Sequence, residues 1–445
     1  MKPMDRPGTD AIKNAQRPIE SPDESRVTLW LLARTFLGIG LASFSLAALG
    51  EAKEWMTTKR KWFTAEEYLQ GLGLAQLLPG APTVNLSSYL GFRLRGLPGA
   101  AVATVCFLTP CFLLMLFLSY LYFHYGEMAV VSGLFRGLGA LVIGLVFNTI
   151  LNLWRSGVRT PFNCLLAVSG FAMVFWFHLG IIGILLIACG ASLAMVLLES
   201  RFPAFARWAG DWKGLKKNNA VSSRSPDHQS RSASDFLSAC RRAPLPTGWR
   251  DMALLIFLLA SLFAADLALI RLRPEIMRMG SSFLRIGALT FGSGYAMLPF
   301  IQNTVVTQFG WLTNSQFAVA LALSLITPGP VTIIGVFIGY KVAGIPGAVA
   351  GMINMYLPAW AMTTVVAAPY ARAGQAVHVK KVISGIVAAF IGTLVVVLIK
   401  LSANTLVDIP SVAMAAGAFF VQRFSKVDTV WIVLGGALLS LAVFH

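Results

Sequence analysis

Charged side chains are scarce in this sequence. Only 12% of its 445 residues are Asp, Glu, Lys or Arg, whereas 56% are hydrophobic and the mean hydropathy is +0.71. A soluble chain carries about twice that charged fraction. Apolar runs long enough to cross a bilayer recur along the chain, for example at 27–50, 99–123 and 128–153. The composition therefore argues against a soluble protein and predicts an all-α polytopic membrane protein.

Patterns typical of catalytic and metal sites are missing as well. The sequence has five cysteines without a CxxC pair, and its five histidines are scattered. It contains no GxSxG, HExxH or Walker-type loop. We interpret the cysteines as small packing residues. We expect no enzyme, no metal and no cofactor, and the missing nucleotide-binding loop excludes ATP-driven transport within this chain.

What the sequence does contain is a duplication. The segment "WFTAEEYLQGLGLAQLLPG" at 62–80 matches "WLTNSQFAVALALSLITPG" at 311–329, and "YLGFRLRGLPGAAVA" at 89–103 matches "FIGYKVAGIPGAVAG" at 337–351. The spacing holds apart from one single-residue gap, and so many shared Gly, Pro and Trp positions indicate an internal repeat. The glycines interpreted as structural elements of this repeat are Gly91, Gly96, Gly339 and Gly344.

The number of apolar segments determines whether the second repeat is inverted relative to the first. Each half offers about six of them, including 66–90 in the first half and 315–340 in the second, and one more, at 251–270, stands between the halves. If all of them span, the chain has about 12–13 transmembrane helices in two homologous, inverted repeats with Pro/Gly-broken helices. The predicted domains are an N-terminal tail (1–26), a first membrane repeat (27–198), a basic linker (199–249), a connecting transmembrane helix (250–280) and a second membrane repeat (281–445).

Basic residues set the expected orientation. The net charge is +17, and it gathers largely in the 199–249 linker and in short loops. Because cytoplasmic loops are rich in Lys and Arg, we expect the N-terminal tail and the linker in the cytoplasm and the C-terminus in the periplasm. The same rule makes nucleic acid an unexpected partner. Residues 1–26 lack the apolar core of a secretory signal, so the first helix should be retained.

Helix-breaking residues interrupt the two halves at matching positions, in "LPGAPTVN" at 78–85 and "TPGPVT" at 327–332. A helix that restarts after a break presents N–H groups with partial positive charge, which bind anions. Within a membrane, unpaired backbone is tolerated only where it lines a cavity or is buried in protein. We expect the two breaks to converge around an anion; the alternative is a pair of proline kinks with tight glycine packing. The candidate substrate-binding residues here are Pro79, Gly80, Pro82, Thr83, Asn85, Pro328, Gly329, Pro330 and Thr332.

A third candidate segment is "LTFGSGYAMLPF" at 289–300. Its glycines could let a ligand approach bare backbone, but close packing of helices explains them equally well. The candidate substrate-binding residues in it are Phe291, Gly292 and Gly294. The counterpart "SFSLAA" at 43–48 lacks these glycines, so we expect an asymmetric site.

Ionisable residues within or beside the apolar segments are few, and each is a functional candidate. Charge roles could fall to Arg93, Arg95, Arg136 and Asp266. Asp266 could carry a coupled proton because it is the one carboxylate inside a predicted span.

Taken together, "LPGAPTVNLSSYLGFRLRGLPGA", "FGSGYAMLPF" and "ITPGPV…IGYKVAGIPGA" resemble the motifs of the chromate ion transporter family in its long two-domain form. The resemblance covers both halves from about residue 30 onward, without the linker. It implies a multi-pass protein of the bacterial inner membrane that exports chromate and confers chromate resistance, with sulfate as a related anion. The expected partners are the lipid bilayer, a coupled proton and a second copy of the chain in a homodimer.

Two departures from the family pattern concern the anion more than the fold. Phe44, Ser45, Leu46 and Ala47 stand where the family has an FGGP-like motif, and Asn85 occupies the place of a frequent Gln. A transporter of sulfate or another oxyanion would share all the features above. A membrane scaffold or sensor built on the basic linker is the alternative from another class, but it would need no broken helices.

Overall fold

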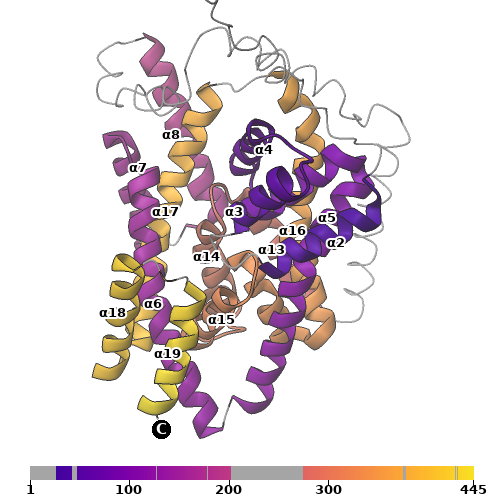
Figure 1. The fold of residues 1–445 in the computed structure, drawn as a ribbon. Coiled ribbons are helices and arrows are strands. Elements are labelled where there is room, and N and C mark those ends of the chain that lie inside the picture. Colours follow the sequence, from indigo (N-terminus) through magenta and orange to yellow (C-terminus); the bar gives the residue numbers. More distant parts are fainter. Residues whose placement is uncertain are drawn as a thin grey trace, which may run out of the picture.

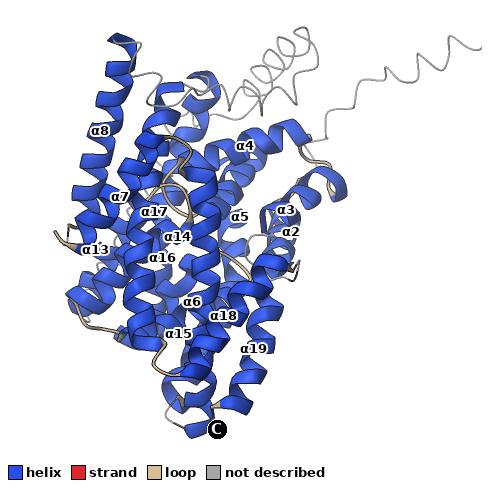
Figure 2. Ribbon diagram, turned by 90° about the vertical axis from the view of Figure 1, so that its left-hand side faces the viewer, coloured by secondary structure: helices blue, strands red, loops and turns tan. Residues whose placement is uncertain are grey.

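The computed structural model describes residues 27–42, 48–126, 128–177, 179–201, 274–373, 377–425, 427 and 429–444. The tail at 1–26, residues 44–47, most of the linker and Asp266 lie outside these ranges. Within them, every regular element is a helix (Figure 2). Five helices are long and apolar enough to cross a membrane, and five shorter helices are also apolar. The fold confirms an all-α polytopic membrane protein.

The helices recur in the same order in the two halves, apart from the short 3-10 helix η5, which is a separate element only in the second half. The first half contains α2 (Leu29–Ala42), α3 (Ala48–Lys53), the π-helix η3 (Glu54–Lys59), α4 (Ala65–Leu77), α5 (Pro82–Tyr125), α6 (Ala129–Gly157), α7 (Pro161–Phe175) and α8 (Ile181–Arg201). The second half contains α13 (Pro274–Leu289), α14 (Gly294–Gln302), η4 (Asn303–Gln308), α15 (Asn314–Ile326), η5 (Val331–Ile333), α16 (Ile334–Ala373), α17 (Val377–Thr405), α18 (Ile409–Phe424) and α19 (Thr429–Val443). The sequence match of 89–103 with 337–351 and the starts of α6 at residue 129 and α17 at 377 give the same spacing, so matching positions from residue 89 onward are 248 residues apart.

Backbone geometry repeats as closely as the sequence does. Both α4 and α15 begin with a capping box, in which the side chains of Thr64 and Thr313 accept a hydrogen bond from the residue three positions on. Both α5 and α16 turn sharply at a glycine: Gly96 has φ 62° and ψ −149°, and Gly344 has φ 63° and ψ −146°. These dihedral angles are almost restricted to glycine, which explains why the residue type is the same in both halves.

The two halves exchange packing partners, and their corresponding long helices run in opposite directions. In Figure 1, α6 rises from the end of the molecule that carries the C-terminus, whereas α17 descends from the opposite end. Two close approaches of a glycine to a backbone carbonyl of the other half are symmetric. Gly144 on α6 lies against the Ala415 carbonyl on α18, and its counterpart Gly392 on α17 lies against the Ala167 carbonyl on α7. Each long helix therefore packs on a short helix of the other half, and the two contacts are related by the repeat.

The segments 66–90 and 315–340, counted above as spans, are broken in the middle. In the first, α4 and the start of α5 lie antiparallel: Glu67 pairs with Arg93, and Gly71 contacts Tyr89. The 13 residues of α4 rise about 20 Å, less than the ~30 Å hydrocarbon core. The chain then turns back at Gly96, so we interpret this pair of helices as a hairpin that enters and leaves the membrane on one side. We infer the same hairpin for α15 and the start of α16 from the matching caps, break and turn.

Candidate functional site

The hairpin tips are the two predicted breaks, and each docks against the long helix of the other half. Gly80, at the first tip, has φ +100°, and a Cβ placed on it would lie 2.5 Å from Cβ of Ala359 on α16. Gly329, at the second tip, has φ +133°, and a Cβ on it would lie 2.9 Å from Sγ of Cys111 on α5. Ala359 and Cys111 are themselves 248 residues apart, so the two docking contacts are related by the repeat.

Both tips also contact the third predicted segment. The Gly80 amide donates a hydrogen bond of 2.9 Å to the Thr290 carbonyl, just before the break between α13 and α14. A Cβ on Gly294, the first residue of α14, would lie 3.5 Å from Cγ2 of Thr332 beyond the second tip. Thr332 in turn donates a 2.9 Å hydrogen bond to the Tyr356 hydroxyl. The three segments singled out in the sequence therefore meet in one place.

A cavity of about 240 Å³ opens beside this meeting point. We call it the Ser293 cavity; its lining residues are Gln76, Leu153, Ser156, Gly157, Gly292, Ser293, Ala296, Val387, Phe390, Ile391 and Leu394. None of them is ionisable. The cavity is many times larger than the ~10–15 Å³ that one water needs, so it has room for a small solvated ion.

The polar part of the cavity is the start of α14. Gly292 has φ +101°, which frees the chain to turn there, and Ser293 is the N-cap residue in an extended conformation. The Ser293 side chain makes no capping hydrogen bond, so its hydroxyl is not used on its own helix. The first amides of a helix and an uncommitted hydroxyl are donors suited to an anion. Phe291, the remaining candidate of this segment, packs partly buried against the core.

Two candidate residues next to the first break have side chains that do not face the Ser293 cavity. The Asn85 amide nitrogen donates to the carbonyls of Ala75 at 3.0 Å and Pro79 at 3.0 Å, and so holds the end of α4. Thr83 faces a space of only about 10 Å³ whose other lining includes Phe36 and Phe107, and its hydroxyl has no hydrogen-bond partner. Neither residue lines the Ser293 cavity. Their predicted contact with an anion stays a prediction.

The prolines of the two breaks lie where their missing N–H groups cost no helical hydrogen bond. Pro82 is the first residue of α5 and Pro330 is the N-cap of η5. Pro79 and Pro328 immediately precede the tip glycines. The structural glycines beyond the tips make close contacts: Gly91 lies against the Gly99 carbonyl, and Gly339 against the Gly347 carbonyl.

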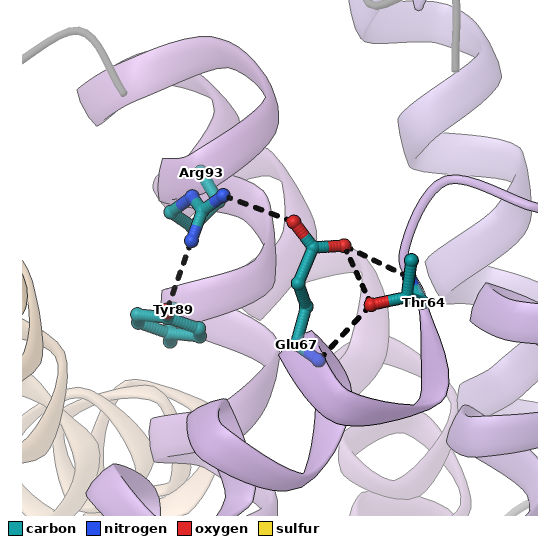
Figure 3. Close-up of polar contacts among 4 residues, drawn as sticks. All are labelled: Thr64, Glu67, Tyr89 and Arg93. Carbon is teal, nitrogen blue, oxygen red and sulfur yellow. Dashed lines mark hydrogen bonds and ion pairs between the residues drawn. The ribbon is translucent and has the colours of Figure 1, made fainter. Parts of the chain in front are cut away.

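The three arginine candidates lie around the site rather than in it. Arg93 closes the base of the first hairpin: its Nη2 lies 3.7 Å from Oε1 of Glu67, and its Nη1 donates a 3.2 Å hydrogen bond to the Tyr89 hydroxyl (Figure 3). The other oxygen of Glu67 accepts hydrogen bonds from the Thr64 amide and hydroxyl. Arg95 donates a hydrogen bond to the carbonyl of Val27, two residues before α2 begins. These two arginines therefore hold helices together.

Arg136 has a different setting. Its Nη2 donates a 2.9 Å hydrogen bond to Oδ2 of Asp408, in the turn between α17 and α18. Hydrogen bonds with Ser411, assisted by the Arg136 guanidinium, lower the pKa of the Asp408 carboxyl below its usual value. Asp408 is thus held in its charged form at neutral pH. The predicted proton carrier, Asp266, lies outside the described residues.

Sequence reasoning missed two polar residues of the Ser293 cavity. Gln76 lies three residues before the first break and Ser156 near the end of α6. Gln76 could have been noticed, since it is the one amide side chain just before "LLPG". Nothing in the sequence around Ser156 brings it near residue 293, because that proximity comes from the packing of the two halves.

Known proteins resemble this chain along most of its length. The family model described as "Chromate transporter" matches residues 30–195 and 277–441, one match in each half. A "Chromate transport protein" of Cupriavidus metallidurans is 30% identical over 421 residues, which is 94% of either chain. A "Probable chromate transport protein" of Synechococcus elongatus is 30% identical over 85% of this chain and 86% of its own.

More distant relatives extend the same result. A "Chromate transport protein" of Pseudomonas aeruginosa is 28% identical over 93% of this chain and 92% of its own. No solved structure matches the chain. The duplicated broken hairpins, the matches to both halves and the relatives of equal extent lead to one conclusion: this chain belongs to the chromate transporter family.

Proposed function

We propose that this protein is a secondary transporter that exports chromate from the bacterial cytoplasm across the inner membrane and so confers chromate resistance. The observation that carries the proposal is the meeting of both hairpin tips with the start of α14, beside the Ser293 cavity. Relatives named as chromate transport proteins supply the substrate class.

The donors around the cavity suit a tetrahedral oxyanion. Ser293, Gly292 and Gly294 offer a hydroxyl and backbone at a helix start, and Gln76 adds an amide. We assign substrate contact to these residues. Among the described residues, the cavity lining has no carboxylate that would repel a dianion and no Lys or Arg that would hold it too tightly for release. Neutral donors of this kind bind anions through backbone dipoles.

The hairpin tips serve as the movable parts of this proposal. Gly80 and Gly329 each contact the other half through one small residue, so a shift of one half against the other changes both contacts together. Inverted repeats of this kind alternate between two exchanged conformations that open the site to opposite sides. A scaffold or sensor would gain nothing from two matching breaks of this kind.

Energetics favours export as the direction. Moving one charge through 100 mV is worth about 2.3 kcal/mol, so a dianion that leaves a negative interior gains about 4.6 kcal/mol. Uptake would need at least two coupled cations merely to balance that term. We place the N-terminus and the 199–249 linker in the cytoplasm and the C-terminus in the periplasm, because of the basic residues in the linker. Proton coupling and a homodimer are predictions that go with this proposal.

Everted membrane vesicles test the function directly. Vesicles that contain the protein should accumulate chromate faster than vesicles without it, and sulfate in excess should compete if the site reads only a tetrahedral dianion. Collapse of the proton gradient should slow accumulation if a proton is coupled. Chromate accumulation no faster than in vesicles without the protein would refute chromate export, and accumulation of sulfate alone would reassign the substrate.

A further inference from the structure

A second polar cavity lies on the other side of the molecule from the Ser293 cavity, towards the C-terminus. It measures about 280 Å³ and lies between the end of α5, the start of α6, the start of α15 and the end of α17. We call it the Arg136 cavity. The polar side chains that line it belong to Tyr122, Arg136, Ser315, Asn404 and Thr405.

The two cavities correspond to each other through the internal repeat. Ser156 and Gly157 of the Ser293 cavity match Asn404 and Thr405 of the Arg136 cavity, because each pair is 248 residues apart. The contact between α6 and α17 is repeated as well: Gly157 lies against Val387 in one cavity, and Thr405 lies against Gly139 in the other. In an inverted repeat, such a pair of cavities faces opposite sides of the membrane.

The charges in the two cavities differ. Position 136 matches Ser384 on α17 and position 408 matches Thr160 before α7, so the counterpart of the Arg136–Asp408 pair is neutral. Asn163 links that counterpart by donating a 3.1 Å hydrogen bond to the Ser384 hydroxyl. An ion pair is therefore found beside the Arg136 cavity but not at the matching positions beside the Ser293 cavity.

The donors of the Arg136 cavity are not used up. Asp408 accepts one hydrogen bond from Arg136, whose guanidinium carries five N–H groups and is about half exposed. The Thr405 hydroxyl is buried, with the residue only 7% exposed, and it has no hydrogen-bond partner. A guanidinium fork with a neighbouring hydroxyl matches the geometry of a tetrahedral oxyanion.

We propose that the Arg136 cavity is a second oxyanion site, the vestibule through which the anion passes on the side of the C-terminus. The inference rests on the proposed function. Arg136 and Thr405 bind the anion, and Asp408 competes with it for the guanidinium. This competition keeps the site weak, so that the anion is released rather than retained.

Thiol labelling tests the site without relying on transport. Ser315 lines the cavity, and a Ser315→Cys variant of the full chain in nanodiscs would be labelled with a charged thiol reagent, against the parent protein as background. Chromate and sulfate should slow this labelling. Arg136→Gln should weaken the protection by roughly 10- to 100-fold, the effect of losing a hydrogen bond to a charged group. Asp408→Asn, which keeps Arg136, should strengthen it.

Arg423→Gln is the matched control. Arg423 lies on α18 with its Nη1 3.5 Å from Oδ1 of Asn152, and it does not line the cavity. Labelling that neither anion slows would overturn the proposal. So would protection that changes equally in Arg136→Gln and Arg423→Gln, or that Asp408→Asn leaves unaltered, because the ion pair would then only hold α6 to α18. Protection by an oxyanion in a protein whose vesicles transport neither anion would support the site and refute the transport function.

Discussion

A methyl group on Gly80 should stop transport by preventing the first hairpin tip from docking. The added Cβ would lie 2.5 Å from Cβ of Ala359, well inside the ~3.5–4.0 Å of a good contact between carbon atoms. Overpacking of this kind costs about 1–3 kcal/mol, and a side chain at positive φ costs about 1–2 kcal/mol more. We expect Gly80→Ala to weaken docking of the tip by about 2–5 kcal/mol.

A second substitution separates this cause from general damage. Ala359→Gly removes the carbon atom that the new methyl group meets, so Gly80→Ala/Ala359→Gly should regain most of the lost transport. Gly96→Ala is the control: Gly96 also has positive φ, but nothing lies within 4 Å of a Cβ there, so only backbone strain applies. Chromate accumulation in everted vesicles and the amount of protein in the membrane should be measured together. Normal transport by Gly80→Ala, or failure of Ala359→Gly to restore it, would refute the docking contact.

Three further predictions follow from named contacts. Asn85→Leu leaves the carbonyls at the end of α4 without their donor, so it should destabilise the protein by about 1–3 kcal/mol. The purified variant should therefore have a lower melting temperature. An unchanged melting temperature would contradict the role of Asn85 in holding α4. Glu67→Gln, which installs the residue type of the matching Gln316, should lower the melting temperature only slightly, whereas Arg93→Leu should lower it more because Arg93 also bonds Tyr89; equal effects would argue against that arrangement. The lowered pKa of Asp408 means that its stabilising charge is present above the unfolded-state pKa of about 3.9 and is lost as the pH falls through the still lower folded-state value. The difference in melting temperature between wild type and Asp408→Asn should therefore stay constant from about pH 5 to pH 8, and a difference that disappears near neutral pH would contradict the ion pair.

Much of this architecture could be predicted from the sequence because the residues shared by the two repeats include glycines that the backbone geometry requires. Gly96 and Gly344 recur because their dihedral angles almost exclude other residues. Gly80 and Gly329 recur because each contacts the other half where no side chain fits. Composition and the positions of these glycines were enough to predict helices, repeat and breaks.

Other features depend on contacts that no local pattern records. The segment 66–90 is apolar enough to be counted as a span, and only tertiary contacts, such as those of Gly71 with Tyr89 and of Glu67 with Arg93, show that it folds back. The Ser293 cavity needs Ser156 from α6 next to residues of α14 and α17, and this proximity follows from the exchange of helices between halves. Thr83 and Asn85 attracted attention as polar residues near a break, yet polarity alone does not say which way a side chain points.

The initial rate of chromate accumulation in everted vesicles, measured against chromate concentration for wild type and Ser293→Ala, tests the central claim most directly. If the anion crosses at the Ser293 cavity, loss of this hydroxyl should raise KM by roughly 10- to 100-fold, the effect of losing one hydrogen bond to a charged group. The amount of protein in the membrane should not change. Ser169→Ala is the control, since Ser169 bonds the Leu166 carbonyl on α7 and does not line the cavity. A KM for Ser293→Ala equal to that of wild type and Ser169→Ala would contradict the assignment of the site.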